Sequence, residues 1–387
     1  MVAVFTAAVT AAPLLRPSVV WVPDEYHTGG AYTAIQAAQD GRVYLGSTFY
    51  DGFARFLVLQ PGAQQFRLVA DMATATGEQT PGPYAQAKIH TKPAIAPDGK
   101  VYFGTKSGKP AESAQWQANY PGGHLLVYDP QSNVVTDLGI ARPRQSIISV
   151  GVDPQRGLVY LLTDPGGHLL VYDPQSRTFA DKGTLADSDR TRYLVVLRNG
   201  DAFHAAGHDA FNRYRPATGQ IERVPLRFSG QGSYERPYTL TAAPDGSKFF
   251  GVGNGSGQFY TFLPGDQFIS VRMHGAIVLE GYRSPSTHYA MSAGPDGNIY
   301  YAATWTGANP ERTLFLMRFV PEVERLETVG EVAPLPTVPP RGRFASHVRR
   351  SARQILVQGA TIGPDGSVYV MTAYPLRVLV FPRLATR

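Results

Sequence analysis

The chain has 387 residues, of which 43% are hydrophobic and 17% charged, so it can bury a sizeable core and is not a disordered protein. It contains 40 Gly, 31 Pro and no Cys, which predicts many turns and few long helices and excludes disulfides, thiolate catalysis and zinc–cysteine sites. The formal net charge of +6 comes without a dense run of Lys and Arg, so we expect no nucleic-acid partner. No segment has the ~20 consecutive apolar residues of a membrane span, so we expect no membrane partner either.

The first residues are apolar and small, and they lack the charged start of a complete export signal. We therefore separate residues 1–17, as either the remnant of such a signal or a disordered end, from a single domain at residues 18–387. The first alternative favours a secreted or periplasmic protein, and we expect a monomer.

A short turn motif recurs along the chain. At Pro97-Asp98-Gly99 it stands between the apolar runs 94–96 and 101–104. An Asp-Gly or Asn-Gly pair in this setting is a strong hairpin signal, because Gly accepts the positive φ of the turn. The spacing of roughly 40–70 residues is typical of one four-stranded blade per repeat. The glycines of the successive turns are Gly41, Gly99, Gly157, Gly200, Gly246, Gly297 and Gly366.

The second half of the repeat is visible in two nearly identical stretches, "GGHLLVYDPQSNVVTDLG" at 122–139 and "GGHLLVYDPQSRTFADKG" at 166–183. Each is interpreted as a third strand, a turn and a fourth strand. The sequence thus predicts an all-β protein, a seven-bladed β-propeller. The last copy lacks an outer strand, and we expect residues 18–22 to supply it and close the ring, since an open ring would leave two unpaired sheet edges.

In a propeller, the loops that enter the first strand and leave the second strand of each blade open on one face, where a rigid scaffold holds binding residues. Almost all polar residues at these positions are cations, His, Tyr or amides, and Asp164 is the only carboxylate. We expect His90, Arg144, Arg192, Arg236 and Arg353 to point into one shared cavity that binds an anion. The residues at this mouth that we expect to bind or act on the ligand are His27, Tyr50, His90, Lys92, Lys106, Arg144, Arg192, Arg236, Asn254, His288, Trp305 and Arg353.

The shortage of carboxylates argues against glycoside hydrolysis and against calcium sites. We predict no metal site and no cofactor, although a divalent metal stays open. The remaining chemistry is β-elimination of a uronic acid: a base removes the proton α to the carboxylate, while Arg or His neutralises that carboxylate. His or Tyr would act as base and acid, and Trp305 and Tyr50 would stack on sugar rings.

Three stretches, "KIHTKPAIAPDGKVYFGT" from Lys88, "YPGGHLLVYDP" from Tyr120 and "SVGVDPQRGLVYLLT" from Ser149, resemble the seven-bladed propeller polysaccharide lyases. These include ulvan lyases and the rhamnosyl-glucuronate lyase that acts on gum arabic. The resemblance implies a catalytic His90, carboxylate-neutralising groups at Arg144, Arg192 and Arg353, and an amide at Asn254. Relatives tend to carry a second His where this chain has Lys106, so Lys106, Tyr50, Tyr193 and Tyr238 remain alternatives for the base.

The sequence therefore predicts an enzyme, a carbon–oxygen lyase that cleaves an anionic, uronate-containing oligo- or polysaccharide, with His90, Arg192, Tyr238 and Lys106 as its catalytic residues. The alternative is a non-catalytic propeller that binds an anionic glycan or a protein through the same mouth, and Lys106 in place of His favours it. A third hypothesis, a lyase or isomerase of a small antibiotic-like molecule, would usually need metal-binding residues that we do not find in the sequence.

Overall fold

The computed structural model describes residues 12–28, 30–50, 52–108, 119–186, 192–253, 255–276, 278–279, 281–283, 285–286, 290–306, 312–335, 356–373 and 376–384. The chain divides into two compact units. The first unit comprises Met1–Trp21, Gln39–Gly41 and Pro225–Arg387, and the second unit comprises Val22–Ala38 and Arg42–Val224.

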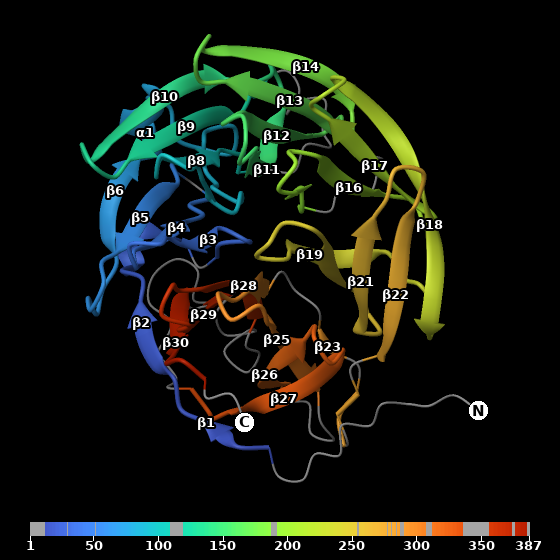
Figure 1. The fold of residues 1–387 in the computed structure, drawn as a ribbon. Coiled ribbons are helices and arrows are strands. Elements are labelled where there is room, and N and C mark those ends of the chain that lie inside the picture. The colour runs from blue at the N-terminus through green and yellow to red at the C-terminus, as the bar shows by residue number, and fades with distance from the viewer. Residues whose placement is uncertain are drawn as a thin grey trace. The chain divides into compact units, whose positions relative to one another are not determined.

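The second unit consists of four antiparallel sheets that follow one another along the chain (Figure 1). In each sheet, four successive strands pair with their sequence neighbours, as expected when short loops join strands in a meander. The first sheet contains β3 (Ile35–Ala37), β4 (Val43–Gly46), β5 (Arg55–Leu59) and β6 (Arg67–Asp71). The second contains β7 (Ala94–Ile95), β8 (Val101–Gly104), β9 (His124–Asp129) and β10 (Val134–Ile140). The third contains β11 (Ser146–Val152), β12 (Val159–Asp164), β13 (His168–Asp173) and β14 (Thr178–Thr184), and the fourth contains β15 (Val195–Val196), β16 (Ala202–Ala206), β17 (Ala210–Arg215) and the start of β18 (Gln220–Gln231).

The first unit holds three further groups of strands with the same neighbour-to-neighbour order. One contains β19 (Pro237–Ala242), β20 (Phe249–Gly253), β21 (Gln258–Pro264) and β22 (Ile269–Ala276), beside which the end of β18 lies parallel, from Leu226 to Gln231. The next contains β23 (Pro285–Ser286), β24 (Met291–Ala293), β25 (Ile299–Thr306), β26 (Arg312–Val320) and β27 (Arg325–Val332). The last contains β28 (Leu356–Ile362), β29 (Val368–Ala373) and β30 (Arg377–Phe381).

The two N-terminal strands both join sheets of the first unit. β2 (Ser18–Trp21) pairs antiparallel with β30 as its outer neighbour, so the predicted strand near residues 18–22 is present in the expected place (Figure 1). β1 (Leu14–Leu15) pairs parallel with Glu331 and Val332 of β27. The expectation of a disordered segment therefore does not hold for Leu14–Leu15, whose backbone groups are paired in a sheet.

The predicted hairpin turns are confirmed. Each of the seven glycines named above has a positive φ, between 65° and 86°, which side chains with a Cβ rarely adopt. In the second sheet, for example, Asp98 accepts a hydrogen bond from the backbone N–H of Lys100 at 3.1 Å, next to Gly99. These local interactions reverse the chain between the first and second strand of each sheet.

Helix is scarce among the described residues. The 3-10 helix η1 (Asp24–Tyr26) is a single turn, and α1 (Met72–Thr76) is capped by Asp71, which accepts a hydrogen bond from the N–H of Ala73 at 2.8 Å. Gly77 ends α1 in the left-handed conformation. Within the described ranges, neither helix is long or apolar enough to cross a membrane.

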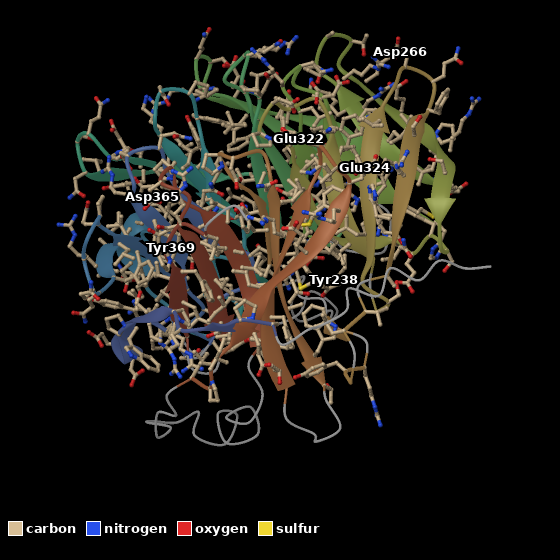
Figure 2. The ribbon with its side chains drawn as sticks, turned by 60° about the horizontal axis from the view of Figure 1, so that its bottom comes forward. Tyr238, Asp266, Glu322, Glu324, Asp365 and Tyr369 are labelled. Atoms are coloured by element: carbon tan, nitrogen blue, oxygen red, sulfur yellow. The ribbon has the colours of Figure 1, made fainter. Side chains whose placement is uncertain are left out.

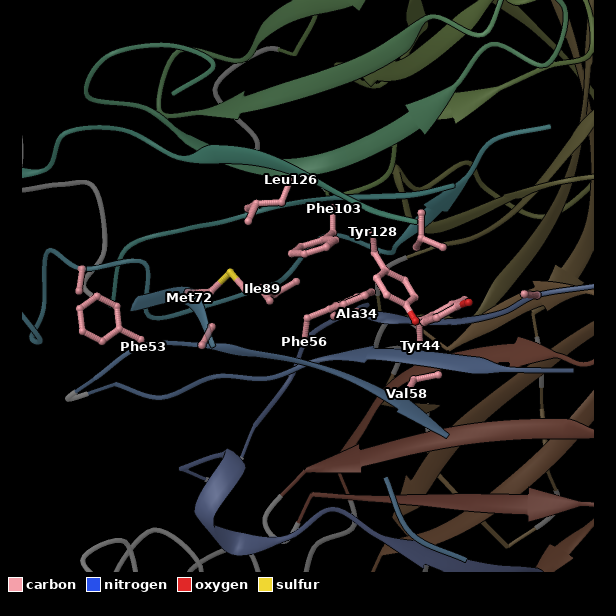
Figure 3. Packing of buried hydrophobic residues seen from close by; sticks show 14 residues of the cluster. Ala34, Tyr44, Phe53, Phe56, Val58, Met72, Ile89, Phe103, Leu126 and Tyr128 are labelled. Carbon is pink, nitrogen blue, oxygen red and sulfur yellow. The ribbon is translucent and has the colours of Figure 1, made fainter. Parts of the chain in front are cut away.

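The core between the first two sheets of the second unit fixes the segment that precedes β7. Phe56 of β5 stacks on Phe103 of β8 with ring centroids 4.0 Å apart, and the fully buried Ile89 packs in the same cluster (Figure 3). A Cβ on Gly46, at the end of β4, would lie 2.3 Å from Cγ2 of Ile89, so only Gly allows this approach. Burying such a side chain stabilises the fold by about 1.5–3 kcal/mol, which holds the neighbouring residue, His90, in place.

The corresponding core of the first unit contains Trp305 of β25. Its side chain is 0% exposed and packs edge-to-face on Phe315, with ring centroids 5.5 Å apart. Within this unit, Figure 2 shows Tyr238, at the start of β19, far from the turns that carry Asp266 and Glu324. Asp266 and Glu324 thus lie on the turns that follow β21 and β26.

Candidate functional site

The candidate site lies in the second unit and is organised by residues 85–91, a buried extended segment outside the regular strands. Lys88 forms isolated β-bridges to both Thr48 and Lys106, which follow the ends of β4 and β8. The backbone N–H of Ile89 also donates to the carbonyl of Ser47 at 3.0 Å. The segment is thus held between the second strands of two neighbouring sheets, and its side chains have fixed positions.

His90 is the centre of the site and is 2% exposed. Its Nε2 lies 2.9 Å from Oγ1 of Thr48, and its Nδ1 lies 2.6 Å from Nη1 of Arg192. Both ring nitrogens therefore have partners within the protein. The ring of Tyr32 lies against the imidazole, with centroids 4.7 Å apart.

These contacts define the protonation state of the imidazole. Arginine has donors only, so Nδ1 of His90 must be the acceptor in its bond with Arg192. The proton of the neutral ring is then on Nε2, which donates to the hydroxyl oxygen of Thr48. Burial lowers the pKa of His90 well below its usual value, and three neighbouring cations lower it further. His90 is consequently a neutral imidazole at neutral pH.

Arg192 bridges His90 to the aromatic ring of Tyr32. Its guanidinium carbon lies 4.9 Å from the ring centroid of Tyr32, within the range of a cation–π interaction. Its side chain is half-buried, whereas those of His90, Lys88 and Lys106 are buried. A planar guanidinium in this position suits bidentate recognition of a carboxylate.

Lys88 is a second cation beside His90, and its amine lies 4.9 Å from the ring centroid of Tyr50. Burial lowers the pKa of Lys88 to about 7, and the positive charges of Lys106 and Arg192 contribute to the shift. An amine with this pKa exists in both protonation states near neutrality, as proton-transfer groups require.

Lys106 differs from Lys88 because it has a counterion. Its Nζ forms an ion pair with Oδ2 of Asp164, and both side chains are buried. The carboxylate favours the charged form of the lysine. Lys106 is therefore held as an ammonium, which argues against the predicted alternative that it serves as the base. We call His90, Arg192, Lys88, Lys106 and Asp164 the His90 cluster.

Thr33 supports the cluster from the loop before β3. Its hydroxyl donates to the backbone carbonyl of His90. Its φ is +58°, a left-handed conformation that is unusual for a β-branched residue. Such backbone strain persists where the surrounding contacts impose it, and it is frequent at functional sites.

The other predicted residues of the second unit have different positions. His27 is buried, with Nε2 3.3 Å from the carbonyl of Val22, and burial lowers its pKa. Lys92 is half-buried, and burial lowers its pKa to about 8. Arg144 is exposed on the turn before β11, where its φ is +59°. Tyr50 is half-buried beside Lys88, and Tyr193 is buried.

The remaining predictions fall on the first unit. Arg236 immediately precedes β19, and Tyr238 is its second residue, both half-buried. The prediction for Trp305 is wrong: a fully buried side chain in an apolar cluster cannot stack on a sugar. Asn254, His288 and Arg353 lie outside the described residues, so the prediction of one shared cavity stays a prediction.

Sequence reasoning missed Lys88, Thr48 and Tyr32. Lys88 could have been predicted from the segment "KIHTK", in which Lys88 and His90 are two positions apart. Alternate residues of an extended segment lie on the same side. Lys88 therefore accompanies His90 wherever that segment is extended. Thr48 and Tyr32 carry no comparable local signal.

Among the residues that the structure describes, no three His, Asp or Glu side chains gather in an arrangement that could hold a metal ion. His204 is buried, with Nδ1 2.9 Å from the carbonyl of Ala205, whereas His208 is exposed.

No protein-family model and no curated protein matches this chain. Solved structures do match. The WD40 repeats of RRP9 are 9% identical, with a TM-score of 0.57 over 95% of this chain and 98% of that chain. A chain of the mitotic checkpoint complex is 11% identical, with a TM-score of 0.58 over 95% and 96%. The extracellular domain of a proposed one-component system from B. thetaiotaomicron is 12% identical, with a TM-score of 0.55 over 95% of this chain and 40% of that chain.

At these identities the similarity defines the fold and no activity. The protein is an all-β protein of the β-propeller type. Its membership of the polysaccharide lyases stays a prediction.

Proposed function

We propose that this protein is a polysaccharide lyase that cleaves a uronate-containing anionic saccharide by β-elimination at the His90 cluster. The observation that carries the proposal is a neutral imidazole, His90, held directly against the guanidinium of Arg192 at 2.6 Å. A neutral base next to a fixed cation is what removal of a proton α to a carboxylate requires.

In the proposed reaction, Arg192 binds the uronate carboxylate. An anionic carboxylate is a stronger acceptor for a guanidinium than a neutral imidazole is. When Arg192 turns to the carboxylate, Nδ1 of His90 loses its partner and its lone pair becomes available. Binding of the substrate thus activates the base, and the positive charge of Arg192 stabilises the enolate-like intermediate.

His90 then takes the proton from the carbon α to the carboxylate. The electrons of that C–H bond form a double bond to the β carbon, and the bond from the β carbon to the glycosidic oxygen breaks. Thr48 keeps the ring oriented through Nε2 during this step, at 2.9 Å. The low pKa of His90 favours return of the proton to solvent after the reaction.

We further propose that the sheets form one ring of seven blades in which β2 completes the last blade. The pairing of β2 with β30 and the sequential strand order of the sheets β3–β6, β7–β10 and β11–β14 support this arrangement. A closed ring would remove the unpaired edges that an open series of sheets leaves.

A second candidate function is non-catalytic binding of an anionic glycan or protein. It is favoured by the fact that both ring nitrogens of His90 are engaged within the protein. If Arg192 does not leave Nδ1, the cluster can attract an anion but cannot remove a proton from it.

The test is incubation of the full chain with ulvan, gum arabic and polygalacturonate, with detection of the new double bond by ultraviolet absorbance and mass spectrometry. We expect an unsaturated uronate from at least one of them, and loss of product in the His90→Gln variant. The Lys100→Met variant, which alters a lysine of the turn before β8 whose side chain is 42% exposed, is the matched control. Binding of a polysaccharide without any product would replace this proposal by the binding function.

A further inference from the structure

Lys88 is a mostly buried lysine whose amine has no acceptor among the described residues. It is 7% exposed, and among the described residues its Nζ makes no hydrogen bond and no ion pair. The Nζ atom lies over the face of the Tyr50 ring, 4.9 Å from its centroid. Buried ammonium groups are normally paired, because removing the charge from water is costly.

Lys106, the other buried lysine of the site, differs from Lys88 in having a counterion. Lys106 is equally buried, yet it is paired with Asp164. The carboxylate of Asp164 is therefore already engaged by one cation of the cluster. Lys88 is left without a carboxylate of its own among the described residues.

The position of Lys88 relative to His90 follows from the backbone. The two residues are separated by one residue in an extended segment, so their side chains leave the backbone on the same side. The charges of Arg192 and Lys88 also act on each other. A carboxylate bound by Arg192 therefore brings a negative charge close to the amine of Lys88.

Building on the proposed lyase function, we infer that Lys88 takes up a proton when the uronate carboxylate binds and then donates it to the glycosidic oxygen that leaves. The balance is complete. His90 receives the proton from the α carbon, and the C–H electron pair becomes the new double bond. The electron pair of the broken C–O bond goes to the oxygen, which takes its proton from Lys88. Afterwards His90 releases a proton to solvent and Lys88 regains one on the next binding event.

The burial of Lys88 and the charges around its amine agree with this assignment. Burial and neighbouring cations lower the pKa of Lys88 to about 7. A bound carboxylate opposes both effects, because an opposite charge favours the protonated form. The group thus becomes protonated upon binding and stays acidic enough to give the proton away.

The first experiment measures proton uptake without turnover. D-glucuronate is titrated into the full chain at about pH 8 by calorimetry in buffers of different ionisation enthalpy. We expect uptake of a sizeable fraction of one proton by the wild type and by Lys100→Met, and its loss in Lys88→Met. Equal uptake by Lys88→Met and the wild type would overturn the inference.

The second experiment measures turnover on whichever polysaccharide the wild type cleaves. Lys88→Arg keeps the positive charge but cannot release its proton, so we expect kcat to fall at least about a hundredfold while KM changes little. Lys88→Met is measured in parallel in case the guanidinium does not fit, and thermal unfolding verifies that both variants are folded.

Turnover within a few-fold of the wild type in Lys88→Met would overturn the role of Lys88 and leave the lyase function intact. Absence of product from the wild type would overturn the lyase function itself. The calorimetric experiment would still test, independently, whether Lys88 takes up a proton when a carboxylate binds.

Discussion

Nη1 of Arg192 donates a hydrogen bond to Nδ1 of His90 over 2.6 Å, between two residues that are 102 positions apart in the chain. This bond places the imidazole proton on Nε2 and joins the group we propose as base to the group we propose as carboxylate binder. In the proposed reaction, an anion that attracts Arg192 frees Nδ1 of His90 to accept a proton.

Removing Arg192 should change the titration of His90. The guanidinium is one of the charges that lower the pKa of His90, so in Arg192→Met the imidazole should become protonated at a higher pH than in the wild type. Two-bond proton–nitrogen NMR of the imidazole measures both the pKa and the tautomer. Arg198→Met, which changes an exposed arginine in a turn, is the control and should leave the titration unaltered. An identical titration in Arg192→Met and the wild type would contradict the electrostatic coupling.

Lys88 should make stability depend on pH. Its pKa is about 7 in the folded protein and near 10.5 when the chain is unfolded, so the unfolded state binds more protons between these values. The free energy of unfolding contributed by Lys88 therefore rises with pH across this window, by at most about 1.4 kcal/mol per pH unit.

This dependence can be isolated by comparison with Lys88→Met. We expect the variant to be more stable than the wild type at about pH 6–7, where the wild type buries an ammonium, and the difference to shrink by about 2 kcal/mol toward pH 9. Urea denaturation at several pH values measures it. A difference that is constant with pH would mean that Lys88 does not titrate in this range.

Removing one partner of the Lys106–Asp164 ion pair should lower the free energy of unfolding more than removing both. Asp164→Asn leaves a buried ammonium without its counterion, and such changes cost about 3–5 kcal/mol. The double variant Lys106→Met/Asp164→Leu removes both charges, so we expect it to regain most of that loss. Chemical denaturation of the wild type, Lys106→Met, Asp164→Leu and the double variant gives the coupling energy, and additive single effects would show that the two side chains do not interact.

Gly46 should be required for the position of His90. In Gly46→Ala the new Cβ meets Cγ2 of Ile89 at 2.3 Å, so Ile89 and the residue after it must move. Overpacking of this kind costs about 1–3 kcal/mol, and we expect altered NMR signals of the His90 ring as well. The double variant Gly46→Ala/Ile89→Ala removes the clashing methyl groups and should restore the ring signals, although the loss of apolar surface keeps it less stable than the wild type.

The hairpin turns and the strand order could be predicted from the sequence because both depend on local chemistry. Gly99 and its counterparts are needed wherever the turn requires a positive φ, and this requirement does not involve distant residues. His90 was singled out from the sequence because it precedes a repeated strand, and the structure places its ring between Thr48 and Arg192. Lys88 was missed although the same alternation places it beside His90.

By itself, then, the sequence determined the all-β repeat and the segment on which the candidate site is built. Only the tertiary structure decided that Lys106 pairs with Asp164, 58 residues away, that Arg192 holds His90, and that Trp305 belongs to the core. The physical reason is that an ion pair or a hydrogen bond depends on where two side chains meet in space. The position of Lys106 in the repeat cannot indicate whether a carboxylate reaches it, and that contact decides whether its amine is held as a cation or is free to exchange a proton.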